Sequence, residues 1–486
     1  MHRSLTDTRI GVLIGVLSFV FTWWYHSVNI AALRAEAPGR LSSYETIKTP
    51  DDNAYLAPAL NYYHDGVWKE HGAGVQRYFL RTPGYGLFRY ALMLGFGEAQ
   101  QFEVVRWFQT LLFALSAVVL FQIFLWMGMP VWWAIGGSLF FGCSPLFSAF
   151  VNYNMTEAIT PALVIFLVGW ALRPQQPWWW MIPGVAVMAM LLLTRPILGV
   201  LLPVFFAGCW RQFMHHKELK TLTALGLAVL PLVIWEVRNT HIAGNFPGLH
   251  PIYHPQSNSM YRSTHEALWN FEKSFGADVT DFHEAVNALW MKDDSMALWR
   301  SCPDWVRASV GEARLQRVFA AYRTSIAMQR RLFPEGTAMP DTIPYYEKAV
   351  AAEISFITTT LWKKQPLRCG MVVPIINLKR IMVHSNLSLY MFQHTYRGRW
   401  WMEVLRAFFV IIHLGCFAGM FGLIWWRRKE RDVWWVAAVS AVSYLLFLAL
   451  VFRAIEERYM LPLLSIGFIG LCWMLWRVTV AGRPRG

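Results

Sequence analysis

The feature that most limits how this chain can fold is a series of long apolar runs, each bounded by polar residues or prolines. Crossing the hydrocarbon of a bilayer takes about 20 apolar residues in a helix. We therefore predict an all-α polytopic membrane protein with about ten transmembrane helices. The runs lie at residues 9–28, 104–126, 131–150, 157–172, 178–194, 196–210, 221–236, 403–426, 433–452 and 459–477. The least distinct boundary is Thr194-Arg195-Pro196, which divides one long apolar stretch.

The composition agrees with this class. Charged residues make up 15% of the 486 residues and hydrophobic residues 56%, whereas a soluble protein carries about 25% charged residues. The 26 tryptophans suit the aromatic belts that form at the lipid headgroups. No small-residue cleavage site follows the first run, so we expect it to stay in the membrane rather than to act as a cleaved signal peptide.

Lysine and arginine in the short connections predict the orientation, because such residues stay on the cytoplasmic side. With both termini cytoplasmic, the outer segments are 29–103, 150–156, 237–402 and 453–458. This assignment divides the chain into an N-terminal transmembrane module with the first outer loop (1–236), an extracytoplasmic helical region (237–402) and C-terminal transmembrane helices (403–486). The formal net charge of +14 is then explained by membrane anchoring and contact with lipid phosphates, and we expect no nucleic-acid partner.

Both large outer segments have helical patterns. Tyr55, Ala59 and Tyr62 predict one face of a short helix lying at the membrane interface. The region 237–402 has several amphipathic stretches and is interpreted as a helical cap on the bundle. Its Cys302 and Cys369 could form a bridge in an oxidising compartment, and the sequence leaves that open.

Two carboxylates and a turn make the first outer loop the strongest candidate for chemistry. Asp51 and Asp52 could only cap the following helix. Alternatively, one of them has a raised pKa because neighbouring carboxylates repel, which suits a catalytic base. Arg81 begins the turn Arg81-Thr82-Pro83-Gly84-Tyr85, where it is either a plain turn residue or a phosphate ligand.

Further polar residues reach the same predicted face from distant parts of the chain. Glu157 follows Thr156 at a helix start, where it is a helix-end carboxylate or a second acid. Arg195 interrupts an apolar run and either extends to the headgroups or acts in the site. Glu236 and Arg238 end the seventh run, and Glu457, Arg458 and Tyr459 begin the last one. The chain has no P-loop, GxGxxG, GxSxG or HExxH motif, so a soluble nucleotide donor is not expected.

These motifs, in this order, resemble those of the type C glycosyltransferase superfamily. The resemblance is nearest to the bacterial branch similar to dolichyl-phosphate-mannose–protein mannosyltransferases and lipid A aminoarabinose transferases. It rests on Pro50-Asp51-Asp52 with Tyr55 and Ala59, on Arg81–Phe88, Ser144–Phe147, Thr156–Ala158 and Leu193–Pro196, on Arg238-Asn239 with Gly244 and Phe246, and on Glu457–Leu464. The chain departs from the family at Thr82, Gly86 and Ser465, and it has Asn152 and Asn154 where the family often has a basic residue.

The resemblance implies a polyprenyl-phosphate-linked sugar as donor, inverting transfer on the extracytoplasmic face and a location in the bacterial inner membrane. Acceptors in the family are lipids, glycans or proteins. The implied base is Asp51, with Asp52 as the alternative. Arg81, Arg195, Arg238 and Arg458 would bind the donor phosphate, and Tyr55, Tyr85, Glu457 and Tyr459 would line the substrate site. Glu157 would orient the acceptor or hold a divalent cation.

Three other functions compete with this one. A lipid or glycan transporter or flippase would have broken spans, repeats and mid-membrane charges. A polyprenyl-linked glycan ligase or polymerase would use the same chemistry on a larger acceptor. A non-enzymatic scaffold would leave the outer-face acids without a role.

Overall fold

The computed structural model describes residues 5–42, 46–49, 52–72, 75–77, 81–173, 177–216, 220–243, 262–276, 281–286, 298–332, 345–453 and 457–481. Regular structure in these ranges is almost entirely helical, as predicted. The exception is one antiparallel hairpin of β1 (Glu70–Gly72) and β2 (Val75–Arg77).

Six helical segments of the described chain are long and apolar enough to cross a membrane. They are α1 (Leu5–Glu36), α4 (Glu98–Trp126), η4 with α9 (Pro196–Leu201 and Leu202–His216), α19 (Trp400–Arg427), α20 with the π-helical turn η7 (Val433–Phe447 and Leu448–Phe452), and η8 with α21 (Glu457–Met460 and Leu461–Ala481). The protein is therefore an integral membrane protein.

Three further apolar helices are shorter, namely α5 (Val131–Cys143), α7 (Thr160–Leu172) and α8 (Met181–Thr194). At 1.5 Å per residue each is only about 20 Å long. Of the three, α7 is buried along almost its whole length, whereas α5 and α8 each keep an exposed face. The predicted run 131–150 is shortened because Ser144 leaves the helix and caps α6 (Pro145–Ser148) by accepting a hydrogen bond from the Leu146 amide. All ten predicted runs coincide with helices, but the seventh, in α10 (Lys220–Ala243), is not among the candidate spans.

Glycines bring the backbones of α19 and α21 into direct contact. A methyl group added at Gly419 would lie 2.2 Å from the Gly467 carbonyl oxygen, and one added at Gly470 would lie 2.3 Å from the Gly419 carbonyl oxygen. Small residues at a helix crossing give membrane helices close van der Waals packing, which replaces the hydrophobic drive available in water. This contact fixes two of the long helices of the bundle.

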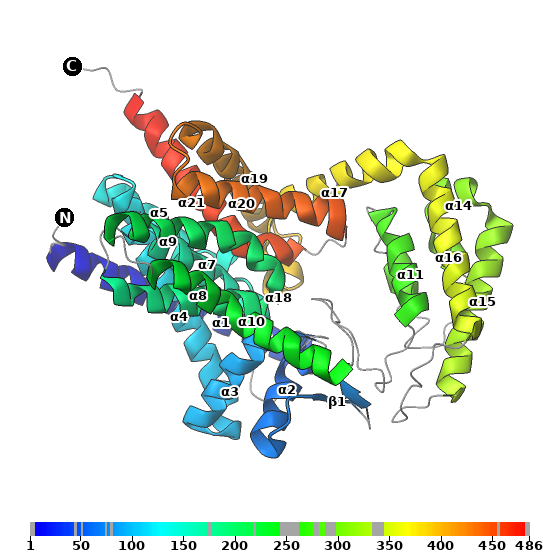
Figure 1. The fold of residues 1–486 in the computed structure, drawn as a ribbon. Helices are drawn as coiled ribbons and strands as arrows, with labels where there is room; N and C mark the ends of the chain where they lie inside the picture. Colours follow the sequence, from blue (N-terminus) through cyan, green and yellow to red (C-terminus); the bar gives the residue numbers. More distant parts are fainter. Residues whose placement is uncertain are drawn as a thin grey trace.

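A second hydrophobic core lies in the region 237–402. Its helices are α11 (Arg262–Lys273), α13 (Leu298–Ser301), α14 (Asp304–Val310), α15 (Glu312–Leu332) and α16 (Tyr345–Lys364). Figure 1 shows them at the end of the bundle opposite the two termini. Cys302 and Cys369 are buried in this core as free thiols, so the bridge that the sequence left open is not formed.

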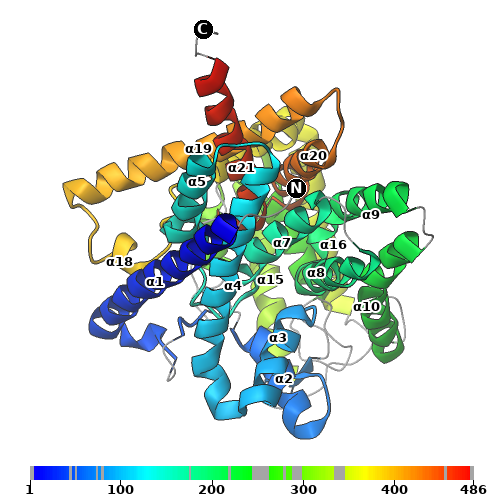
Figure 2. The same ribbon diagram turned by 90° about the vertical axis from the view of Figure 1, so that its left-hand side faces the viewer.

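The chain then returns to the bundle through the π-helical turn η6 (Arg368–Val372), α17 (Val373–Met382) and α18 (Tyr390–Gln393). Side chains from α17 and α18 join the bundle core rather than the second core. The end-on view in Figure 2 shows α18 beside α1 at the edge of the bundle, where Asn29 accepts a hydrogen bond from the Met391 amide. The last outer segment contacts the second core, because a methyl group at Gly276 would lie 2.6 Å from the Arg453 carbonyl oxygen.

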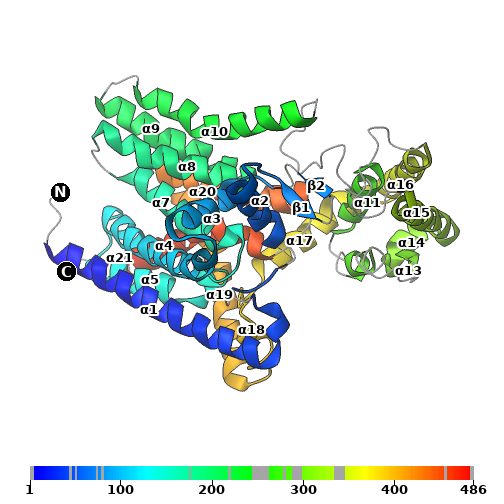
Figure 3. The same ribbon diagram turned by 90° about the horizontal axis from the view of Figure 1, so that it is seen from below.

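The first outer loop lies between the bundle and the second core (Figure 3). It contains η1 (Pro38–Arg40), α2 (Asp52–Asp65), the β1–β2 hairpin and α3 (Gly84–Phe96). A helix forms over Tyr55, Ala59 and Tyr62, as predicted, and Tyr55 and Ala59 are buried. Tyr62 is 40% exposed, and its ring packs at an angle against the rings of Trp68 and Tyr90.

Candidate functional site

Two predicted motifs meet where α3 begins. A methyl group at Gly84 would lie 2.5 Å from the Leu193 carbonyl carbon and from the Thr194 amide nitrogen. The Thr82 hydroxyl donates a hydrogen bond to the Thr194 carbonyl oxygen at 3.3 Å. The turn after Arg81 therefore packs backbone to backbone on the end of α8, and Gly84 is required there by this close approach.

Arg195 directly follows the end of α8, and its side chain lies in the protein interior. The helix stops at Thr194 because Pro196 disfavours helical geometry in the residue before it, and Arg195 has extended geometry with φ −148° and ψ 101°. Arg195 Nη2 donates to Glu157 Oε1 at 3.0 Å. Glu157 lies in the 3-10 turn η2 (Thr156–Ala158) and is almost wholly buried.

Glu157 is shared between two arginines. Arg458 Nε lies 3.5 Å from the same oxygen, Glu157 Oε1, while the Thr156 hydroxyl donates to Oε2 at 2.8 Å. Burial lowers the pKa of Arg195, but Glu157 and neighbouring tyrosines outweigh burial and raise it overall, so the guanidinium stays charged. Among the described residues, Arg195 Nη1 is buried and has no hydrogen-bond partner. The cluster of two guanidinium groups and one carboxylate therefore keeps one buried donor without an acceptor among those residues.

Aromatic rings hold the arginines in place. The guanidinium of Arg195 lies 5.1 Å from the centre of the Tyr459 ring, and that of Arg458 lies 5.7 Å from it. Arg81 lies over the Tyr55 ring at 5.4 Å, and Tyr55 packs edge-on against Tyr85 at 5.7 Å. These cation–π contacts orient the guanidinium groups without neutralising them.

Asp52 is the first residue of α2 and is partly buried. Burial raises the pKa of Asp52, and hydrogen bonds from Thr49 and Asn154 together with the charge of Arg89 oppose the rise. The Thr49 hydroxyl donates to Asp52 Oδ1 at 2.6 Å. Asp51, the other predicted acid, lies outside the described residues.

Arg89 is a buried arginine that the sequence analysis did not select. It lies in α3, is fully buried, and donates from Nε to Gln101 Oε1 at 2.8 Å and from Nη1 to Asn154 Oδ1 at 2.6 Å. The neighbouring Tyr85 is also fully buried and donates from its hydroxyl to Gln109 Oε1 at 2.7 Å. Burial raises the pKa of Tyr85 to about 12. The only signal in the sequence was one arginine within the apolar stretch that follows the Pro-Gly turn.

Arg238 lies at the rim of the site. It donates from Nη2 to the Trp68 carbonyl oxygen at 2.7 Å and from Nη1 to Asn239 Oδ1 at 3.0 Å, and it covers the Trp235 ring at 4.5 Å. Trp68 is close to α3, because a methyl group at Gly86 would lie 2.8 Å from its ring. Glu457 begins η8 next to Arg458, and its side chain is outside the part of the chain that the structure describes.

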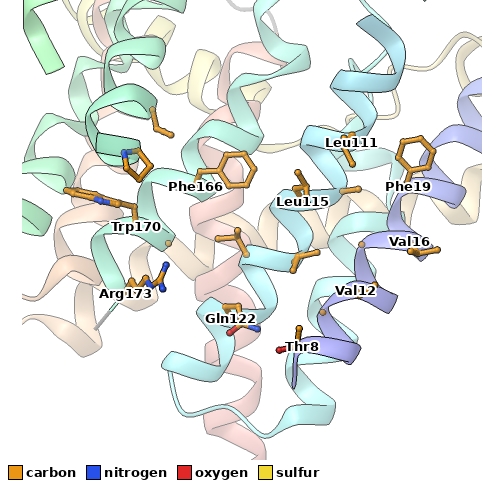
Figure 4. A pocket seen from close by; sticks show the side chains of 18 of the residues that line it. Thr8, Val12, Val16, Phe19, Leu111, Leu115, Gln122, Phe166, Trp170 and Arg173 are labelled. Carbon is orange, nitrogen blue, oxygen red and sulfur yellow. The ribbon is translucent and has the colours of Figure 1, made fainter. Parts of the chain in front are cut away.

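A separate apolar groove of about 1040 Å³ runs between α1, α4, α7 and α8. Figure 4 shows Val12, Val16, Leu111, Leu115 and Phe166 along it. The polar residues that line it include Asp7, Thr8, Gln122 and Arg173, and Figure 4 shows Thr8, Gln122 and Arg173 toward one end. None of the predicted site residues is among the residues that line the groove.

Among the residues with described positions, no group of three or more His, Cys, Asp and Glu side chains is arranged to hold a metal ion. Both oxygens of Glu157 already have protein partners, Arg195 with Arg458 on one side and Thr156 on the other. The carboxylates described at the site therefore provide no ready-made cage of the kind that Ca²⁺ requires.

No family model matches the sequence, and no curated protein matches it. Solved structures that are similar to the chain include the following. The archaeal oligosaccharyltransferase AglB from Archaeoglobus fulgidus, in complex with an inhibitory peptide and a dolichol-phosphate, is 12% identical with a TM-score of 0.42. ArnT from Cupriavidus metallidurans is 16% identical with a TM-score of 0.32 when bound to undecaprenyl phosphate, and 15% identical with a TM-score of 0.33 in the apo state.

The matches cover 99% of this chain for AglB, 96% for ArnT with undecaprenyl phosphate and 92% for apo ArnT. In the other direction, they cover 53% of AglB and 78% of each ArnT chain. The chain thus spans about half the length of AglB.

Proposed function

We propose that this protein is a membrane glycosyltransferase that moves a sugar from a polyprenyl-phosphate donor to an acceptor at the extracytoplasmic face. The observation that carries the proposal is that Arg195 and Arg458 share the single carboxylate of Glu157. In addition, Arg195 Nη1 is buried and has no hydrogen-bond partner among the described residues. A buried guanidinium with a donor that no described residue meets is costly unless an anion completes it. A phosphate group, bound by the planar fork of arginine, is such an anion.

The chemistry matches the way charge would develop in the reaction. An acceptor hydroxyl oxygen attacks the anomeric carbon while the bond from that carbon to the phosphate oxygen breaks, which inverts the anomeric centre. The proton of the hydroxyl passes to a carboxylate, and the lipid-linked phosphate leaves as a monoester with one more negative charge than the diester had. Fixed guanidinium groups aimed at that oxygen stabilise the transition state more than the ground state.

The residues fall into distinct roles. Arg195 and Arg458 bind the phosphate, while Arg81 and Arg238 lie further out and guide the donor. Asp52 accepts the proton, because its raised pKa brings it nearer to that of a useful base; Asp51 is the alternative. Glu157 holds the two arginines, and Tyr55, Tyr85, Tyr459 and Glu457 line the substrate site. The apolar groove provides a surface for a lipid chain.

The test is to purify the protein in lipid nanodiscs and to incubate it with a panel of polyprenyl-phosphate sugars and candidate lipid, glycan and protein acceptors. Transfer of one sugar, seen as a mass increase of the acceptor, is the expected result. Transfer of a whole glycan would indicate a ligase or polymerase. Movement of the labelled lipid across the bilayer with no change in its mass would establish a flippase and contradict the proposal.

Two variants connect the activity to the site. Arg195→Lys keeps the charge but loses the planar fork, so we expect turnover to fall more than donor affinity. Asp52→Asn should lower turnover by about 10²-fold or more, the scale of general-base loss. Arg428→Lys is the matched control, because Arg428 stacks on Trp425 at the far end of α19. Wild-type turnover in Arg195→Lys would remove Arg195 from phosphate binding.

A further inference from the structure

Arg89 is the most deeply buried charged group near the candidate base. Its guanidinium is fully buried, with hydrogen bonds to Gln101 and Asn154, and its Nη2 has no hydrogen-bond partner among the described residues. Burying an ionised side chain costs several kcal/mol unless other groups compensate for it. The two hydrogen-bond acceptors named here are neutral amide oxygens, so they only partly do so. A bundle that needed only packing at this position would be served better by an apolar residue.

Asn154 connects Arg89 to Asp52. The Asn154 oxygen accepts from Arg89 Nη1 at 2.6 Å, and its amide nitrogen donates to Thr46 Oγ1 at 2.9 Å. The Asn154 side chain also faces Asp52 and lowers the pKa of its carboxyl, which favours the ionised form. The amide is thus held between a cation and a carboxylate, with its orientation fixed by the cation. A guanidinium at the oxygen side polarises the amide and strengthens the bond that its nitrogen donates.

We propose that Arg89, acting through Asn154, is a positioning residue that keeps Asp52 ionised and correctly oriented to take the acceptor proton. The inference deepens the proposed function and depends on Asp52 being the base. Arg89 is buried behind Asn154 and touches no substrate in this arrangement. Its effect on the reaction therefore reaches the base only through its charge and through the Asn154 amide.

The groups facing Asp52 come from three elements. Thr49 precedes α2 and donates to the carboxylate, Asn154 comes from the segment before η2, and Arg89 and Tyr85 come from α3. Tyr85 has a pKa of about 12, so it stays neutral over the working range. Of these groups, only Arg89 carries a charge that favours the ionised carboxylate.

The experiment measures turnover against pH for wild type, Arg89→Gln, Arg89→Lys and Asn154→Ala. In Arg89→Gln the acidic limb of the profile should move upward by about one pH unit, since an opposite charge nearby lowers a carboxyl pKa by that much or more. Arg89→Lys should return the limb toward its wild-type position. Arg106→Gln is the control, because Arg106 is another buried arginine and its guanidinium lies over Trp23 of α1; its limb should not move.

A second readout does not depend on activity. An infrared titration of the Asp52 carboxyl band, isolated by subtracting the spectrum of Asp52→Asn, should show the same upward move in Arg89→Gln. A uniform loss of turnover at every pH, with the band unmoved, would mean that Arg89 only supports the fold and would overturn the inference. If Arg89→Gln does not fold, Asn154→Ala decides, and an unshifted limb and band in that variant would overturn it.

The same data separate the two proposals. Wild-type turnover in Asp52→Asn would show that Asp52 is not the base. That result would reject both this inference and the role of Asp52 in the proposed function. Loss of turnover in Asp52→Asn, together with an unshifted profile in Arg89→Gln, would leave the proposed function standing and reject Arg89 alone.

Discussion

Removing the charge of Glu157 should destabilise the protein in a way that an anion can reverse. Glu157→Gln keeps the shape of the side chain but leaves the guanidinium groups of Arg195 and Arg458 without their shared carboxylate at 3.0 and 3.5 Å. Breaking a buried ion pair from one side costs 3–5 kcal/mol. We take the lower end, about 3 kcal/mol, because the arginine side chains are 14% and 18% exposed and keep their contacts with the Tyr459 ring.

The measurement is thermal unfolding of the protein in nanodiscs, with and without a polyprenyl phosphate. We expect Glu157→Gln to unfold several degrees below wild type without the lipid, and to gain more stability than wild type when the lipid is added, because the phosphate can take the place of the missing carboxylate. Glu403→Gln is the control: Glu403 is 57% exposed and lies 3.9 Å from Arg406, so its loss should cost at most about 1 kcal/mol. A Glu157→Gln protein as stable as wild type would refute the ion-pair argument, and equal stabilisation of both by the lipid would refute phosphate binding at this cluster.

Four other outcomes are expected. Gly419→Val should abolish stable folding, because even a methyl group there meets the Gly467 carbonyl oxygen at 2.2 Å; a normal yield of folded protein would contradict that packing. Because the pKa of Asp52 is raised, the folded state binds the carboxyl proton more tightly than the unfolded state does. The stability that this proton contributes is present at low pH and is lost as pH rises through the folded-state pKa. Asp52→Asn should therefore be more stable than wild type at neutral pH, and a less stable variant would contradict the burial of the carboxylate. Turnover should survive treatment with EDTA, because Glu157 is already bound by arginines, and loss of turnover with recovery on adding Mg²⁺ or Mn²⁺ would show a metal requirement. A cysteine placed at position 300 should be labelled from outside intact cells and one at position 429 only after permeabilisation; the reverse result would invert the topology.

The helices were predictable because a bilayer requires each spanning helix to be both long and apolar. Both properties can be seen in a single continuous stretch of the sequence. The division of one long apolar stretch at Thr194-Arg195-Pro196 was predictable for the same reason, since a proline constrains the residue before it. The shortening of α5 was not predicted. It depends on the Ser144 cap, which looks like an ordinary small polar residue inside an apolar run.

The site was only partly predictable. The sequence indicated that Asp52, Glu157, Arg195 and Arg458 lie at one face of the bundle, because the predicted topology places all four on the outer side. It did not indicate that Arg195 and Arg458 share Glu157. Arg195 lies 38 positions after Glu157 in the chain, and Arg458 lies 301 positions after it. Contacts of this kind depend on how helices pack, which a local pattern does not record.

If the cluster binds a phosphate as proposed, the position of Glu157 explains how that phosphate is released. On the proposed reaction, the leaving phosphate gains a negative charge, and two unopposed arginines would bind that product so tightly that its release would limit the rate. A fixed carboxylate between them offsets part of their attraction for both the donor and the product, while leaving Arg195 Nη1 free to meet the charge that develops. Only an interaction that strengthens in the transition state raises turnover. We therefore expect Glu157→Gln to bind the product phosphate more tightly than wild type and to turn over more slowly, which product-inhibition kinetics would measure; weaker product binding in that variant would contradict this account of Glu157.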